Sequence, residues 1–147
     1  MNLFHPKDAS MYIKEEFDQM QSKVSPFMKK SMIYGGLAFP LITISIFNLF
    51  FLLSSVSINK DTIVIFGLLA LAGALGMAFF KELTHQNRRM HETSVHYIKE
   101  RIAQSDQLPD YAKDRYLKEI RMNPANVFQT FYDFLKHEER IKNLDRS

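Results

Sequence analysis

Charged and uncharged positions are sharply segregated along the chain. No Asp, Glu, Lys, Arg or His occurs from Ser31 to Asn59, and a second such stretch runs from Thr62 to Phe80. At about 1.5 Å per residue, the 19 residues of the second stretch would form a helix of about 28 Å, close to the ~30 Å of bilayer hydrocarbon. The first stretch is longer than one span requires, and we place its membrane core near residues 37–56. The pattern predicts a two-span transmembrane helical hairpin.

A short polar turn is expected between the two spans, and it comprises Ser54, Ser55, Ser57, Asn59, Lys60 and Asp61. Asp61 or Thr62 can cap the second helix. Two core helices of a soluble protein are the alternative, but 147 residues with a polar remainder could not cover two helices that are apolar on every face. A cleaved signal peptide also fits badly, because many charged residues precede a first stretch that is too long for an h-region.

An amphipathic helix is predicted before the first span. Apolar residues at spacings of four and three share one face, namely Ile13, Phe17, Met20, Val24 and Phe27. The other sides carry Lys14, Glu15, Glu16, Asp18 and Gln19. Ser25 and Pro26 predict a break or kink before the span. The apolar face could lie on the membrane or pack on the C-terminal helices, and the acidic residues favour protein packing.

Proline positions divide the chain beyond the second span. No Pro or Gly occurs there before Pro109, so the second helix should continue out of the membrane to residue 101 or beyond. Pro109 can occupy the first position of a short helix that ends at Met122. Asn123 and Pro124 repeat this signal, and they predict a last helix that runs to about residue 143.

Aromatic residues form one face of this last helix. The face comprises Phe128, Phe131, Phe134 and Leu135, with Val127 and Glu138 on it or at its edge. These side chains require a covering surface, which is either a small core shared with the other helices or a second protein. A bundle of this size buries little surface, so membrane attachment or oligomerisation could stabilise it.

Basic residues cluster beside the two spans. We expect anionic lipid headgroups to contact Lys29, Lys30, Lys81, Arg88 and Arg89. Each such contact would favour membrane binding by about 1 kcal/mol. Beyond residue 90 acidic and basic residues balance, which disfavours nucleic-acid binding despite a pI near 9.1. The basic residues on both sides of the hairpin predict a plasma-membrane protein with both termini in the cytoplasm.

The fold class predicted is therefore all-α, with three segments. Residues 1–30 form the N-terminal amphipathic helix, 31–80 the transmembrane hairpin, and 81–147 a cytosolic helical region.

Small residues recur in the second span, where they could allow close helix packing. They are Gly67, Ala70, Gly73, Ala74 and Ala78. The two spans of one chain could pack through them, or copies of the chain could form a homo-oligomer. A pore built from several hairpins could be lined by Thr43, Ser45 and Asn48. The spans carry no charged residue at depth, which disfavours a pump or carrier.

Few residues offer catalytic or metal chemistry. The chain has no cysteine, which excludes disulfides, thiolate metal sites and cysteine nucleophiles. His91, Glu92 and His96 approach the zinc-binding His-Glu-x-x-His pattern, but their spacing is one residue too long. On a helix the two imidazoles would diverge by about 140°, so we expect no metal site and no cofactor. Because no catalytic motif is present either, the sequence does not indicate an enzyme.

Two stretches resemble a small, uncharacterised family of two-span membrane proteins from Bacillus-like bacteria. They are residues 87–102 (NRRMHETSVHYIKERI) and 123–135 (NPANVFQTFYDFL). The resemblance implies a plasma-membrane location and no particular activity. The sequence thus favours a non-enzymatic integral membrane protein that presents a helical cytosolic module to a protein or to lipid. The alternative is an oligomeric pore or an accessory subunit of a transporter.

Overall fold

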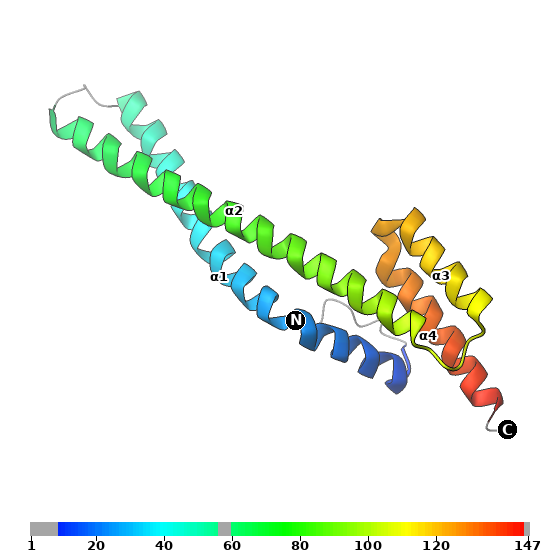
Figure 1. The fold of residues 1–147 in the computed structure, drawn as a ribbon. Coiled ribbons are helices and arrows are strands. Elements are labelled where there is room, and N and C mark those ends of the chain that lie inside the picture. The colour runs from blue at the N-terminus through cyan, green and yellow to red at the C-terminus, as the bar shows by residue number, and fades with distance from the viewer. Residues whose placement is uncertain (1–8, 56–59, 146–147) are drawn as a thin grey trace. The chain divides into compact units, whose positions relative to one another are not determined.

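The computed structural model describes residues 9–55 and 60–145, and in these ranges it is all-α. The helices are α1 (Met11–Ser55), α2 (Lys60–Ala103), α3 (Asp110–Met122) and α4 (Val127–Leu144), and a 3₁₀ turn, η1 (Pro124–Asn126), precedes α4 (Figure 1). The chain divides into two compact units. The bundle comprises the chain up to Val24 and from His91 onward, and the hairpin comprises Ser25–Met90.

The hairpin consists of the second part of α1 and the first part of α2, which run antiparallel. Near its open end, Ser31 Oγ donates a hydrogen bond of 2.6 Å to Asn87 Oδ1. Further along, Gly76 lies so close to α1 that an added Cβ would be 2.8 Å from Ile42 Cγ1. Because any larger residue would have to displace Ile42, this glycine sets the close approach of the two helices.

The bundle has its own apolar core, to which all four helices contribute. Its most deeply buried side chains include Met20 from α1, Ile98 and Ile102 from α2, Ile120 from α3, and Phe131, Phe134 and Leu135 from α4. Burying each such side chain stabilises the fold by about 1.5–3 kcal/mol. The ring centroids of Phe17 and Phe131 are 5.4 Å apart, so the N-terminal apolar stripe packs on α4. This agrees with protein packing, the favoured alternative for that stripe.

The ends of the C-terminal helices follow the polar and proline signals closely. Helix α2 continues to Ala103, as the absence of earlier Pro and Gly residues predicts. Pro109 is the N-cap rather than the first residue of α3, which ends at Met122 as predicted. Helix α4 ends at Leu144, one residue beyond the predicted end.

Ser25 and Pro26 predict a break or a kink, and the break is wrong, because α1 continues through both Pro26 and Pro40. Each proline removes one backbone N–H donor. Val24 before Pro26 and Ala38 after it are both buried, so α1 is held by packing on either side of this proline. Pro26 nevertheless lies beside the boundary between the bundle and the hairpin.

At the other end of the hairpin, α2 already begins at Lys60, so Asp61 and Thr62 belong to its first turn and do not precede it as caps. The predicted turn residues Ser57 and Asn59 lie outside the described residues.

Large apolar side chains of the hairpin are exposed. Only 11% of the most apolar stretch of α1 and 6% of that of α2 is buried, whereas a core helix of a soluble protein would be mostly buried. The exposed residues include Phe39, Phe47, Phe50, Phe51 and Leu53 on α1, and Ile63, Val64, Leu68 and Leu71 on α2. The structure thus contains two helices that are long and apolar enough to cross a membrane.

Candidate functional site: a buried charge cluster and an open cleft

Arg101, in the last turn of α2, is the centre of a charge cluster inside the bundle. Its Nε donates a hydrogen bond of 3.0 Å to Glu16 Oε1 on α1, and its Nη2 lies 2.8 Å from Glu138 Oε2 on α4. The same Nη2 is 2.7 Å from the Tyr12 hydroxyl. One guanidinium therefore connects three helix segments that are far apart in the sequence.

Both oxygens of Glu138 have several hydrogen-bond donors. Oε1 accepts hydrogen bonds from Ser105 Oγ and from Arg101 Nη1, and Oε2 accepts from the Tyr12 hydroxyl and Arg101 Nη2. Burial raises the pKa of Glu138, but the hydrogen bonds from Ser105, Tyr12 and Arg101 outweigh burial and leave the pKa below its ordinary value. The Glu138 side chain is only 3% exposed, yet it remains ionised at neutral pH.

The ionisation of the other groups follows from the same contacts. Burial lowers the pKa of Arg101, but hydrogen bonds to Glu16 and Glu138 raise it above its ordinary value. Burial raises the pKa of Tyr97 to about 12, with a further contribution from the charge of Glu16. Burial likewise raises the pKa of Tyr12, supported by its hydrogen bond to Glu138. At neutral pH both tyrosines are therefore neutral; Tyr12 donates its hydroxyl hydrogen bond to Glu138, and Tyr97 donates one of 3.4 Å to Glu16 Oε2.

The cluster is an ion-pair network, and its geometry is poorly suited to proton transfer. A general base needs a free lone pair and a pKa near the working pH, whereas Glu138 is engaged on both oxygens and its pKa is lowered. Removing one partner of such a buried pair leaves an uncompensated charge. We therefore interpret the cluster as a connection between α1, α2 and α4.

Sequence reasoning missed this cluster. The assignment of Glu16 to the polar side of α1 is wrong, since Glu16 is buried and contacts Arg101. The spacing did contain a signal, because Glu16 is three residues after Ile13 and four before Met20 and so shares their face. Glu138 likewise follows Phe134 by four residues. An acidic residue within an apolar helix face indicates a buried partner of opposite charge.

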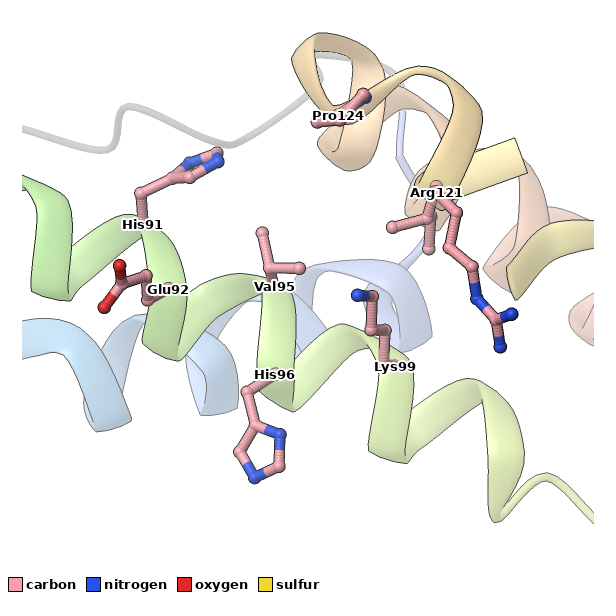
Figure 2. Close-up of a pocket in the computed structure, with 8 residues that line it drawn as sticks. His91, Glu92, Val95, His96, Lys99, Arg121 and Pro124 are labelled. Atoms are coloured by element: carbon pink, nitrogen blue, oxygen red, sulfur yellow. The ribbon is translucent and has the colours of Figure 1, made fainter. Parts of the chain in front are cut away.

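An open cleft of about 470 Å³ lies on the bundle between α2, α3 and η1. Val95 and the buried Ile120 make part of its lining apolar, and Pro124 borders it. Lys99 from α2 and Arg121 from α3 supply two positive charges, and Glu92 from α2 supplies one negative charge, so the lining carries a net positive charge. Figure 2 shows the Arg121 side chain extending along the gap between the helices that carry these residues. An apolar lining beside cationic groups suits an amphipathic partner with acidic groups.

The two histidines beside the cleft diverge, as their spacing predicts. Figure 2 shows the His91 ring on the side of α2 that faces Pro124 and the His96 ring on the opposite side of the helix, although both residues contribute to the lining of the cleft. His91 lies edge-on to Phe128, with ring centroids 6.4 Å apart, and His96 Nε2 is 3.3 Å from Glu100 Oε1. Within residues 9–55 and 60–145, no group of three or more His, Asp or Glu residues could hold a metal ion.

The other predicted site residues form three sets, which differ in their burial. Phe131, Phe134 and Leu135 are fully buried in the bundle core, while Phe128 is half-buried at its edge. The basic residues proposed for lipid contact are all exposed on the hairpin, and they are Lys29, Lys30, Lys81, Arg88 and Arg89. The small residues of α2 do not share one environment.

Two of the glycines in α2 pack inside the hairpin, while the alanines do not. An added Cβ at Gly73 would lie 3.4 Å from Ser45 Cβ, so Gly73 and the neighbouring Gly76 face α1. The other small residues of this set are exposed, namely Gly67, Ala70, Ala74 and Ala78. Ser45, one of the residues that could line a pore in an assembly, is buried beside Gly73 in the hairpin of the single chain.

The structure thus defines an all-α protein with two long apolar helices and a helical bundle that has its own core. Residues 5–143 match the family of unknown function DUF5392, and the chain belongs to this family. It is similar to the uncharacterised protein YwnF of Bacillus subtilis (strain 168), with 36% identity over 144 residues that cover 98% of this chain and 99% of that protein. No solved structure matches the chain. These findings confirm the resemblance to an uncharacterised family represented in Bacillus.

Proposed function

We propose that this chain is a non-enzymatic, two-span protein of the plasma membrane that presents its helical bundle in the cytoplasm for contact with another protein or with lipid. The main support for this proposal is the contrast in burial: the bundle buries its large apolar side chains, while those of the hairpin are exposed. Water would penalise the exposed surface, whereas bilayer hydrocarbon would not. The basic residues beside the spans support cytoplasmic termini.

Washing isolated membranes at alkaline pH tests the integral-membrane part of this proposal. Peripheral proteins leave the membrane under these conditions, and we expect the full chain to stay in the pellet. Recovery of the chain in the supernatant would contradict insertion of the hairpin.

The cleft beside Lys99 and Arg121 is the surface that we propose for a protein contact. Its apolar lining and positive charge support binding of an acidic, amphipathic segment. A photo-crosslinking residue in place of Lys99 or Arg121 should give a discrete crosslinked species in intact cells, and one in place of the exposed Lys118 should not. Equal crosslinking at all three positions, or none, would contradict a contact at this cleft.

Self-association is the second candidate, as an oligomeric pore or an accessory subunit of a transporter. The observation in its favour is that Ala70, Ala74 and Ala78 recur every four residues and are exposed on α2. The polar groups of the first span support a pore less well. Thr43 and Asn48 donate to carbonyls of their own helix, and Ser45 is buried. Replacing the three alanines with leucine should abolish any oligomer seen by crosslinking in membranes.

A further inference from the structure

An apolar groove of about 420 Å³ lies between the two helices of the hairpin. Gly35, Ala38 and Phe39 of α1 line it together with Met77, Phe80 and Leu83 of α2. Because Gly35 and Ala38 are small, they leave a space between the larger side chains that border the groove. The volume lies within the range of about 300–1,000 Å³ that is typical of small-molecule sites.

The lining of this groove is suited to hydrocarbon. Thr43 contributes a hydroxyl, but its Oγ1 already donates a hydrogen bond of 2.8 Å to the Phe39 carbonyl. Since this hydroxyl is satisfied within its own helix, it does not require a polar guest. Phe39 and Phe80 are both exposed at the border, so a long chain could enter from the side without displacing the core of the hairpin.

Positive charge is concentrated at the same end of the hairpin. Lys81 directly follows Phe80, and Lys29 and Lys30 precede Gly35 on the other helix. Arg88 and Arg89 add to this charge. Glu82 is the acidic residue at this end, and it accepts a hydrogen bond of 2.6 Å from Gln86. An apolar groove that adjoins a cationic end matches a molecule with a hydrocarbon chain and an anionic head.

We propose that the groove holds one acyl chain of an anionic phospholipid, whose headgroup lies beside Lys81. This inference rests on the proposed membrane insertion, and it adds a defined lipid site to the general attraction of basic residues for anionic membranes. The lipid would exchange more slowly than its neighbours, because both its chain and its headgroup have a dedicated contact.

Tryptophan fluorescence can test the site, because the chain contains no tryptophan. A Phe39→Trp reporter lies at the groove. A Leu37→Trp reporter lies two residues away, about 200° around the same helix, and outside the groove lining. The full chain is reconstituted in phosphatidylcholine vesicles that contain phosphatidylglycerol, and either lipid carries bromine atoms that quench tryptophan. We expect about a fivefold preference for phosphatidylglycerol at residue 39 and none at residue 37. Equal preferences at the two positions would overturn the proposal.

Substitution of adjacent glycines tests whether the groove itself is responsible. Gly35 lines the groove, whereas the neighbouring Gly36 has no heavy atom within 4 Å of its added Cβ and does not line it. In the Phe39→Trp chain, Gly35→Leu should abolish the preference and Gly36→Leu should preserve it. Lys81→Gln should lower the preference about fivefold, and Lys118→Gln should not change it. A preference that survives Gly35→Leu would overturn acyl-chain binding in the groove.

The quenching experiment also separates this proposal from the proposed membrane insertion. If the hairpin is inserted, brominated phosphatidylcholine must quench both reporters, whether or not the groove binds a particular lipid. If neither reporter is quenched by either brominated lipid, insertion itself is wrong. Quenching of both reporters without any difference between the lipids would overturn the groove proposal alone.

Discussion

The bundle and the hairpin are both rich in large apolar residues, but the bundle buries these side chains and the hairpin exposes them. Phe131 and Phe134 of the bundle are fully buried, whereas Phe47 of the hairpin is 75% exposed. The apolar residues of the bundle form one face of each helix, and those of the hairpin surround the helices. Burial thus shows that the bundle has its own core, and the exposed apolar surface of the hairpin is what supports the proposed insertion into a membrane.

Polar groups show the same difference. In the bundle, Arg101 and Glu138 pair across helices, although they are 37 residues apart in the sequence. In the hairpin, Thr43, Asn48 and Ser54 donate hydrogen bonds to carbonyls four residues earlier in their own helix. Such local bonds satisfy polar groups within a single helix, as the proposed insertion into a membrane requires, while the network in the bundle specifies how distant segments meet.

The largest expected difference comes from the same substitution made in each region. Phe134→Ala should lower the free energy of unfolding of the bundle by about 3–5 kcal/mol, because it leaves a cavity in a filled core. Phe47→Ala removes an exposed side chain and should leave the stability of the bundle unchanged. Hydrogen exchange of α4 amides in mild detergent would measure both. Equal loss of protection in the two variants would contradict the division into two regions.

Breaking the charge cluster should have a similar effect. Arg101→Met leaves Glu16 and Glu138 without their partner, and we expect a loss of about 3–5 kcal/mol in the free energy of unfolding. A variant that also carries Glu16→Gln and Glu138→Gln removes the uncompensated charges and should recover most of this loss. Urea unfolding followed by circular dichroism would compare them. If the triple variant is no more stable than Arg101→Met, the loss comes from packing and not from buried charge.

A smaller effect is expected from glycines of the hairpin. Gly76→Ala should destabilise the hairpin by about 1–3 kcal/mol, because its Cβ would meet Ile42 Cγ1 at 2.8 Å. Gly67→Ala meets open space and should be neutral or slightly stabilising. Thermal unfolding in detergent would rank the two variants. The reverse order would show that the close approach at Gly76 is wrong.

For Glu138 and Tyr97, the contribution to the stability of the bundle should depend on pH only at acidic and at strongly alkaline values. Because the folded-state pKa of Glu138 is lowered, its stabilising contribution is present above pH 4.5 and is lost as the pH falls through the lowered value. Tyr97 acts in the opposite sense. Its contribution is complete below pH 10 and is lost as the pH rises toward about 12.

Matched variants can assign these two limits. Glu138→Gln should weaken the dependence of bundle stability on acidic pH, and Tyr97→Phe should weaken it on the alkaline side. Unfolding in urea across the pH range would measure both changes. An unaltered acid profile in Glu138→Gln would show that other carboxylates determine it.

Much of the helical layout could be predicted because its signals are local. Pro109 is the N-cap of α3, and Pro124 begins the 3₁₀ turn that precedes α4 at Val127, three residues later than predicted. The stretches without charged residues mark the apolar parts of α1 and α2. The break expected at Pro26 failed because tertiary packing on both sides of a proline can support a continuous helix. The local sequence pattern indicates which secondary structure a segment prefers. It does not indicate which other segments pack against it.

The candidate site was harder to predict because it depends on contacts between distant segments. Glu16 and Arg101 are 85 residues apart, and nothing near either residue identifies the other as its partner. The small residues of α2 illustrate the same limit. Their spacing was visible, but only the structure shows that Gly73 and Gly76 face α1 while Ala70, Ala74 and Ala78 do not.

Cysteine labelling in intact cells would determine directly on which side of the membrane each region lies, because the chain contains no cysteine of its own. One variant carries Asn59→Cys between the two spans, and another carries Lys118→Cys in the bundle. A membrane-impermeant maleimide should label residue 59 in intact cells and residue 118 only after the membrane has been permeabilised. Labelling of residue 118 in intact cells, or protection of residue 59, would contradict a two-span hairpin with a cytoplasmic bundle.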